Sequence, residues 1–448
     1  MKRDIMAELL NWKNSKERKP LVLEGVRQCG KTYTLEEFGW NNYEDVAKFN
    51  FEENPSRISL FEQDFDTKRI LFELGLLHGK TIYPEKTLVF FDEIQACCRA
   101  LTSLKYFCEN AREYHIVCAG SLLGLAIHGG QSFPVGKVDI KKRYPLSFYE
   151  FLEATGEAAL TEYLREVKAG IKLSEPVSAK LQTALRQYYV VGGMPEVVAA
   201  WCEDNSIEKV ESVQQQILNS YELDMVKHAP AKDYPKLSAI WASVPQQLSK
   251  PNSKFIFSQV KKGWRAKDLE DALQWLVGAG LVYKVCRIEK PFLPLSSYAD
   301  ATCFKLYLSD VGLLRRLAKL PAQVVLESSK IYTEFKGAMT ENYVLNELIK
   351  HVSDTAYYWS SGNKAEVDFV VQTGINIVPI EVKSEENVKA RSLAEYRKKY
   401  EPAISVKTSM KPDIREGGVL NIPLFMIGSL NGIAADSFQK KEIVGEIL

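Results

Sequence analysis

The stretch LVLEGVRQCGKT, residues 21–32, joins a short apolar run to a loop that contains two glycines. Residues 25–32 match the pattern G-x-x-x-x-G-K-S/T at every fixed position. The apolar run predicts a β-strand, and TLEEF at residues 34–38 predicts a helix. This order of strand, loop and helix is the context in which such a loop binds phosphate. We therefore predict a nucleotide site here rather than an ordinary tight turn.

All eight loop residues are expected to contact ATP: Gly25, Val26, Arg27, Gln28, Cys29, Gly30, Lys31 and Thr32. The glycines let backbone N–H groups point into the loop, and the following helix directs its positive end toward the phosphates. Lys31 is expected to reach the β- and γ-phosphates, and Thr32 to bind Mg²⁺.

A second motif, TLVFFDE at residues 87–93, is an apolar run that ends in two acids. It predicts a buried parallel strand that delivers carboxylates to its carboxyl end, where open α/β sheets bind ligands. Asp92 is expected to hold Mg²⁺ through water, and Glu93 to orient or deprotonate the attacking water. The alternative is that both acids simply begin the next helix, whose N-terminus favours negative charge.

Two further residues are weaker candidates for the nucleotide site. Ser121 ends the predicted strand HIVCAGS, where it could sense the γ-phosphate or merely cap the next helix. Arg143 could stabilise transition-state charge, in its own chain or from a neighbouring subunit, or could be an exposed structural arginine. The second of these roles would require a homo-oligomer, which is therefore one of the expectations.

The composition of the 448 residues predicts a soluble, cytoplasmic protein. The 58 Lys and Arg residues balance 57 Asp and Glu residues, so nucleic acid or lipid binding would need a local patch. The eight cysteines form no C-x-x-C pair, which favours a reducing compartment. The N-terminal residues mix charged and apolar positions, unlike a secretory signal, and no apolar run is long enough to cross a membrane.

The chain is expected to be an α/β protein of four parts. Strands alternate with helices to about residue 150, which predicts a parallel sheet, and helical patterns then dominate. Helices followed by a β-ribbon suggest a winged-helix module, and the last part reads as a second α/β unit that ends in a strand at residues 425–428. The parts are an ATPase core, a helical lid, a winged-helix-like domain and a second α/β domain: residues 1–150, 151–230, 231–322 and 323–448.

Three polar residues can converge in the last part. Asp368 and Glu381 lie on strands that flank the hairpin sequence TGIN, and Lys383 shares a strand face with Glu381. Two carboxylates can hold Mg²⁺ or Mn²⁺ while a lysine positions or deprotonates a water, and Glu341 could supply a third acid. The alternatives are a surface ion pair, or a fold that survives only as a binding platform.

Two basic segments could contact DNA or RNA. One contains Lys389, Arg391, Arg397, Lys398 and Lys399, but Glu385, Glu386 and Glu395 lie among them, so an ordinary solvated helix fits equally well. The other lies in the winged-helix segment, where a protein-docking or lid role is equally open; its residues are Lys261, Lys262, Trp264, Arg265 and Lys267.

Taken together, the motifs resemble those of bacterial and archaeal AAA-type ATPases that carry a conserved C-terminal domain of unknown function. The resemblance spans nearly the whole chain, and its motifs are GVRQCGKT, LVFFDEIQ, CAGSLLG, RYPLSFYEFL, YYVVGGMPEVV, KLYLSDVGLL, EVDFVV and IEVK. It implies a P-loop NTPase core and a C-terminal domain similar to the restriction-endonuclease-like PD-(D/E)-x-K fold. Cys29 departs from the residues usual within this loop, which leaves ATP binding undisturbed.

Three functions remain in competition. The first is an ATP-dependent switch or motor whose downstream domains respond to nucleotide state. The second is an ATP-regulated, metal-dependent nuclease. The third is a nucleotide-controlled regulatory scaffold that binds nucleic acid or another partner without cleavage.

Overall fold

The computed structural model describes residues 1–121, 133–166, 173–250, 253–362, 365–384, 391–411, 414–416 and 418–434. The chain divides into two compact units. Residues 2–145, with residues 278–281, form one of them, here called the N-terminal unit. The other, here called the C-terminal unit, comprises residues 146–277 and the chain from residue 282 onward, together with Met1.

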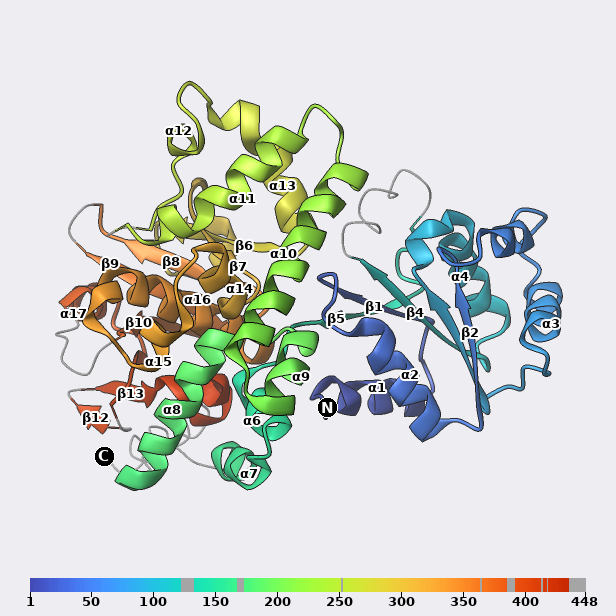
Figure 1. Cartoon of the computed structure of the whole chain (residues 1–448), viewed down its shortest axis with the longest axis horizontal. Helices are drawn as coiled ribbons and strands as arrows, with labels where there is room; N and C mark the ends of the chain where they lie inside the picture. The colour runs from blue at the N-terminus through green and yellow to red at the C-terminus, as the bar shows by residue number, and fades with distance from the viewer. Residues whose placement is uncertain are drawn as a thin grey trace. The chain divides into compact units, whose positions relative to one another are not determined.

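The N-terminal unit contains a five-stranded parallel sheet in the order β2-β3-β4-β1-β5 (Figure 1). Its strands are β1 (Leu21–Gly25), β2 (Asp45–Asn50), β3 (Thr87–Asp92), β4 (His115–Ser121) and β5 (Asp139–Arg143). Because the strands are parallel, the phosphate loop after β1 and the acids at the end of β3 lie at the same edge of the sheet. β5 was not predicted, since four of the five residues in DIKKR are charged and it lies at the edge of the sheet.

Helices cover both faces of this sheet because its strands are apolar on both sides. Leu21 and Leu23 pack in one cluster with α1 and α2, whereas Val22, between them, packs in another with α3 and α4. The helices are α1 (Ile5–Asn14), α2 (Lys31–Asn42), α3 (Thr67–His78) and α4 (Cys98–Asn110). The unit is therefore a three-layer α/β structure, as the strand pattern predicted.

Helices make up the first part of the C-terminal unit. They are α6 (Phe148–Ala154), α7 (Ala158–Glu166), α8 (Glu175–Val191), α9 (Pro195–Asp204), α10 (Ile207–His228), α11 (Tyr234–Leu248), α12 (Phe257–Val260) and α13 (Ala266–Gly278). The helices predicted within residues 151–230 are present in the described part of that range. The order of α11, α12 and α13 before a ribbon is the order expected of a winged helix, which stays a prediction.

The C-terminal unit also contains an eight-stranded mixed sheet in the order β12-β13-β11-β10-β9-β8-β6-β7. The ribbon strand β6 pairs in parallel with β8, so the ribbon and the last α/β part share one sheet. The predicted division at residue 322 thus does not separate two sheets. The strands are β6 (Val282–Ile288), β7 (Ala299–Leu308), β8 (Tyr357–Ser360), β9 (Glu366–Thr373), β10 (Asn376–Val382), β11 (Ser405–Ser409), β12 (Ile414–Glu416) and β13 (Val419–Pro423).

The remaining helices of this unit are α14 (Val311–Leu317), α15 (Ala322–Leu326), α16 (Thr333–His351) and α17 (Arg391–Tyr400). The strand predicted at residues 425–428 is wrong, because Leu424–Ser429 forms a 3₁₀ helix. The last strand, β13, comes just before it, and its final residue Pro423 pairs with Ser409 at the end of β11. β11 provides no partner residue beyond that pair. The apolar residues 424–427 therefore form the 3₁₀ helix and are buried in the core.

Glycines at residues 192 and 193 join three segments of the C-terminal unit. The turn between α8 and α9 is the one that the sequence GGMP predicted. The Gly193 N–H donates to Oδ2 of Asp310 at 2.6 Å, and its carbonyl accepts from the Leu146 N–H at 2.6 Å. A Cβ atom on Gly193 would lie 2.2 Å from the Leu146 carbonyl oxygen, so a side chain does not fit without backbone movement.

Replacing Gly193 by alanine is therefore expected to lower the free energy of unfolding by about 2 kcal/mol or more, because the new methyl group overlaps backbone atoms. Thermal and urea denaturation measure the effect. The matched control is Gly337→Ala in α16, where a Cβ atom meets nothing within 4 Å and where alanine favours the helix. Equal stability of the two variants would contradict the role given to this contact.

Candidate functional site

The phosphate loop closes on the side chain of its own lysine. Lys31 begins α2, and its ammonium donates to the carbonyl oxygens of Gly25 and Val26, both at 3.0 Å. Gln28 and Gly30 have positive φ angles of 63° and 84°, which turn the backbone into the helix. The Lys31 side chain therefore lies within the curve of the loop, where the first N–H groups of α2 have no partners inside the helix.

Gly25 has no room for a side chain. It pairs with Arg143 on β5, and a Cβ atom would lie 2.3 Å from the Arg143 carbonyl oxygen and 2.8 Å from the Cys29 sulfur. Cys29 is fully buried, and its thiol donates to the same carbonyl oxygen at 3.4 Å. Cys29 therefore packs beneath the loop, away from solvent.

Asp92 connects three segments at the edge of the sheet. The Thr32 hydroxyl donates to Oδ1 of Asp92 at 3.0 Å, and the Glu93 N–H donates to the same oxygen at 3.2 Å. The Lys48 ammonium lies 3.2 Å from the other oxygen, Oδ2. Asp92 is 2% exposed, so its charge is balanced by these neighbours rather than by bulk water. The structure thus brings together the two motifs that the sequence predicted to meet.

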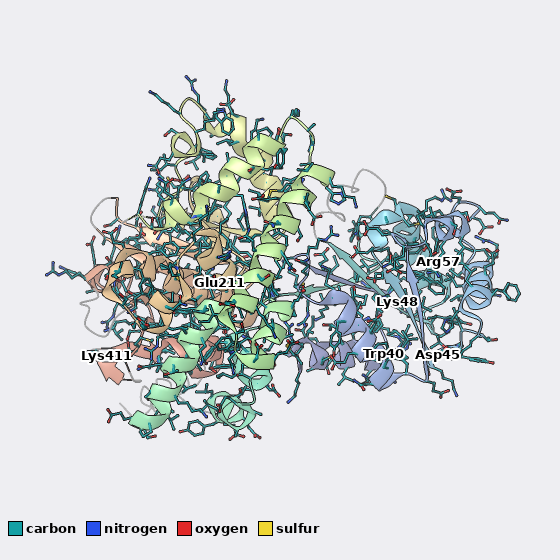
Figure 2. The ribbon with its side chains drawn as sticks, viewed as in Figure 1. Trp40, Asp45, Lys48, Arg57, Glu211 and Lys411 are labelled. Carbon is teal, nitrogen blue, oxygen red and sulfur yellow. The ribbon has the colours of Figure 1, made fainter. Side chains whose placement is uncertain are left out.

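Lys48 and Asn50 belong to this site and were missed from the sequence. Asn50 pairs with Asp92 across β2 and β3, and its amide lies 3.5 Å from Oδ2 of Asp92. Burial alone would lower the pKa of Lys48, but hydrogen bonds and the charges of Glu36 and Asp92 raise it overall. The alternation of polar and apolar residues in AKFN could have shown that both face one side of β2. Figure 2 labels Lys48 within the N-terminal unit.

Glu93 has a backbone conformation that is uncommon outside glycine, with a φ angle of 50°. It precedes a short 3₁₀ helix, but its side chain makes no capping hydrogen bond there. Instead the Gln95 amide donates to Oε2 of Glu93 at 2.5 Å. Glu93 thus stands directly before a helix, as the alternative expected, and its catalytic role stays a prediction.

The two weaker candidates lie on strands beside β1. Ser121 pairs with Gly25 through the backbone, but its side chain and the helix it was expected to cap lie outside the described residues. Arg143 pairs with Gly25 on the other side and is only 4% exposed. The exposed position that was the alternative for Arg143 is therefore wrong, and its role at the nucleotide site stays a prediction.

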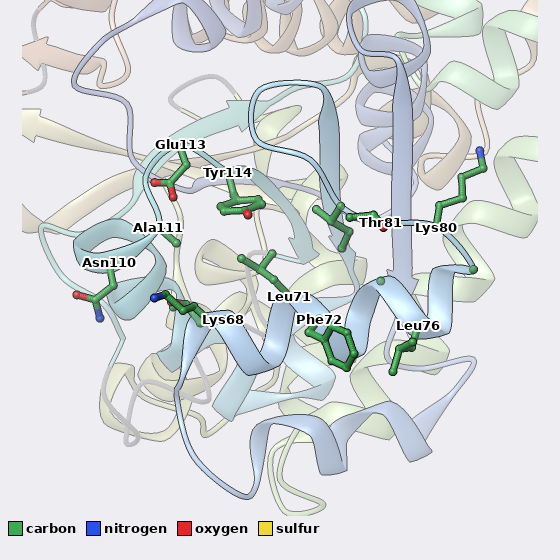
Figure 3. Close-up of a pocket in the computed structure, with 14 residues that line it drawn as sticks. Lys68, Leu71, Phe72, Leu76, Lys80, Thr81, Asn110, Ala111, Glu113 and Tyr114 are labelled. Carbon is green, nitrogen blue, oxygen red and sulfur yellow. The ribbon is translucent and has the colours of Figure 1, made fainter.

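A separate pocket of about 520 Å³ lies in the same unit (Figure 3). It is lined by Leu71, Phe72 and Leu76 of α3 and by Ile82 and Tyr114, among others. None of the phosphate-loop residues or the acids of β3 lines it. The pocket is therefore distinct from the candidate nucleotide site.

The C-terminal acids converge as predicted from the hairpin. In the antiparallel register of β9 and β10, Ile380 pairs with Phe369, so Glu381 follows opposite Asp368. Oδ2 of Asp368 accepts the Val382 N–H at 2.7 Å, and the Lys383 ammonium lies 2.7 Å from Oε1 of Glu381. Oε2 of Glu381 is buried without a hydrogen-bond partner among the described residues.

The same cluster includes residues that the sequence did not indicate. Lys305 on β7 is 1% exposed, and its ammonium lies 2.5 Å from Oε1 of Glu366 and 3.7 Å from Oε2 of Glu341. The Tyr307 hydroxyl donates to Oε2 of Glu341 at 2.8 Å. No local pattern could have identified Lys305, because its partners lie on β9 and α16, far along the chain.

Burial governs the ionisation of these acids. It raises the pKa of Asp368 well above its usual value, and the charges of Glu341 and Glu381 raise it further. Burial also raises the pKa of Glu381, against the opposing charge of Lys383. Within the part of the chain that the structure describes, no three His, Cys, Asp or Glu side chains are arranged to hold a metal ion. The divalent ion that the sequence pattern suggested for these acids therefore stays a prediction.

The basic segments are only partly described. Lys389, Glu385 and Glu386 lie outside the described residues. Of the rest, Lys399 packs over the rings of Trp359 and Tyr400, and Lys261 packs over the ring of Trp264. Neither arrangement tests nucleic-acid binding. Among the helices in the described ranges, none combines the length and apolarity needed to cross a membrane.

Comparison with known families divides the chain into three matched regions. Residues 17–152 match an AAA domain, whereas residues 182–324 and 336–425 match two different domains of unknown function. No curated protein sequence matches the chain.

Several solved structures are similar to the chain at low sequence identity. The Walker-type ATPase of Pyrococcus abyssi is 15% identical, with a TM-score of 0.44 over 71% of this chain and 95% of its own. The RuvB Holliday junction branch migration motor of Thermotoga maritima is 13% identical, with a TM-score of 0.31 over 64% of this chain and 90% of its own. AMPPCP-bound DnaA from Aquifex aeolicus is 13% identical, with a TM-score of 0.24 over 60% of this chain and 74% of its own.

Such TM-scores are too low to establish the architecture of the whole chain. The family match at residues 17–152 covers the five-stranded sheet, the phosphate loop and the acids of β3. The N-terminal unit is therefore an AAA-type P-loop ATPase domain.

Proposed function

We propose that this protein binds and hydrolyses Mg-ATP and acts as a nucleotide-dependent switch or motor. The observation that carries the proposal is the 3.0 Å hydrogen bond from Thr32 to Asp92. It joins the end of the phosphate loop to the acid of the neighbouring motif, as a magnesium site of this kind requires. Both residue types fit the ion, since hydroxyl and carboxylate oxygens are the ligands that Mg²⁺ prefers.

The loop residues bind and orient the phosphates. Lys31, now bound to two loop carbonyls, exchanges these contacts for phosphate oxygens, so its charge stays compensated in both states. The backbone N–H groups at the start of α2 bind the same phosphates. Thr32 and Asp92 would hold Mg²⁺, which neutralises phosphate charge when it is bound.

The residues around Asp92 prepare the hydrolytic step. Glu93 accepts a proton from the attacking water or orients it, and Gln95 holds the Glu93 carboxylate in place. Lys48 and Asn50 orient Asp92 from β2. Ser121 ends the strand between β1 and β3, where a response to the γ-phosphate can reach both motifs.

Lys31→Ala is expected to abolish nucleotide binding, because the variant loses the cation that compensates the phosphates. In the parent protein, Mg-ATP at about 100 times its Kd should stabilise the N-terminal unit by about 2.7 kcal/mol, seen as a thermal shift. The control is Lys86→Ala in the same unit, where the lysine side chain is 60% exposed. A parent protein without any shift would contradict the proposal at its first step.

Glu93→Gln is expected to separate binding from hydrolysis, since the amide retains the shape of the side chain but cannot accept a proton. The thermal shift with Mg-ATP should persist while phosphate release falls by about 100-fold or more. Phosphate release at saturating ATP measures this. Unchanged hydrolysis in Glu93→Gln would remove Glu93 from the mechanism and leave ATP binding untouched.

For the C-terminal unit, we propose a nucleotide-controlled scaffold rather than a metal-dependent nuclease. The support is that Glu341, Asp368 and Glu381 each contact a donor from the protein itself. DNA or RNA remains a candidate partner for this unit through its basic segments, and a homo-oligomer remains a proposal too.

An assay on plasmid and single-stranded DNA with Mg²⁺ or Mn²⁺ is expected to show no cleavage, with or without ATP. The Glu381→Ala, Lys383→Ala double variant serves as the reference for contaminating activity. Cleavage by the parent protein that disappears in the double variant would favour the nuclease instead.

A further inference from the structure

Lys305 is a buried cation that contacts two acids of the C-terminal cluster, which comprises Glu341, Glu366, Asp368 and Glu381. It comes from β7, whereas Glu366 comes from β9 and Glu341 from α16. Its ammonium lies 2.5 Å from the Glu366 carboxylate and 3.7 Å from the Glu341 carboxylate, and the charge of Asp368 also acts on it. The ammonium also lies over the ring of Tyr358, 5.2 Å from its centroid. An ammonium that is 1% exposed has exchanged its water for these groups.

We propose that Lys305 supplies the cation that this acid cluster requires, in the position that a divalent metal ion would otherwise take. A group of buried carboxylates on adjacent elements is unstable unless positive charge lies among them. In a metal site that charge comes from the solution. Here it is part of the chain, and the eight-stranded sheet brings it from the β6–β7 ribbon to the acids.

The other contacts of the cluster agree with an internal cation. The Tyr307 hydroxyl donates to Glu341, the Val382 N–H donates to Asp368, and Lys383 pairs with Glu381. Each acid of the predicted metal site therefore has a protein donor for one of its oxygens, whereas Oε2 of Glu381 has none among the described residues. Lys305 and Lys383 together offset the charges of Glu341, Glu366, Asp368 and Glu381.

The inference goes beyond the proposed ATPase activity and does not depend on it. It assigns to β7 a function in the acid cluster, so the ribbon and the last α/β part are held together by charge as well as by strand pairing. It also explains why the acids resemble a nuclease site while lacking an arrangement that fits a metal among the described residues.

The test measures Mn²⁺ binding to the nucleotide-free full-length chain. The electron paramagnetic resonance signal of free Mn²⁺ reports how much of the ion is unbound. The parent protein and the Asp368→Asn variant should bind Mn²⁺ equally, because the parent has no Mn²⁺ site that depends on Asp368. Asparagine is the chosen substitute because its amide oxygen can still accept the Val382 N–H. Lys305→Met removes the charge at similar side-chain length and should bind Mn²⁺ roughly tenfold more tightly or better, since a vacated anionic site attracts the ion. Adding Asp368→Asn to Lys305→Met should abolish that gain.

Lys305→Arg is the matched control, because it keeps the positive charge and should bind Mn²⁺ no better than the parent protein. Asp368-dependent Mn²⁺ binding by the parent protein would overturn the proposal, as would a folded Lys305→Met variant without any gain. If Lys305→Met does not fold, the double variant Lys305→Met, Glu366→Gln removes one charge of each sign and carries the same expectation.

Discussion

The parallel arrangement of the N-terminal sheet is the constraint on which the candidate nucleotide site depends. β4 lies between β1 and β3, and all three strands point the same way. The loop after β1 and the acids after β3 therefore meet at one edge, where Thr32 donates to Asp92 at 3.0 Å. A strand of opposite direction at either place would put its polar residues at the far end of the sheet.

Charge is handled differently in the two units. At the phosphate loop, Lys31 donates to two backbone carbonyls. Asp92 contacts Thr32, the Glu93 N–H, Lys48 and Asn50. These contacts can be exchanged for those of a charged ligand. In the C-terminal cluster, Lys305 and Lys383 already pair with the carboxylates. The first arrangement suits reversible binding, whereas the second suits a permanent structural role.

Predictions succeeded where the structure depends on residues close in sequence, and they failed where it depends on a distant partner strand. The strand before the phosphate loop was predicted correctly, because its apolar run and the adjoining loop are local features. β5 was missed, since DIKKR is a strand only because β1 offers it a partner. The strand expected at residues 425–428 failed for the converse reason, because β11 ends opposite Pro423 and leaves no partner beyond it.

Residues near one another in the chain were enough to specify the phosphate loop and the acids of β3, and to predict that Asp368 and Glu381 meet across a hairpin. Pairing across the hairpin involves only adjacent strands, so its register follows from local sequence. The roles of Lys48 and Lys305 were decided by tertiary structure alone. Whether a charged side chain lies in solvent or among acids depends on which distant elements pack around it, and no short-range pattern records that.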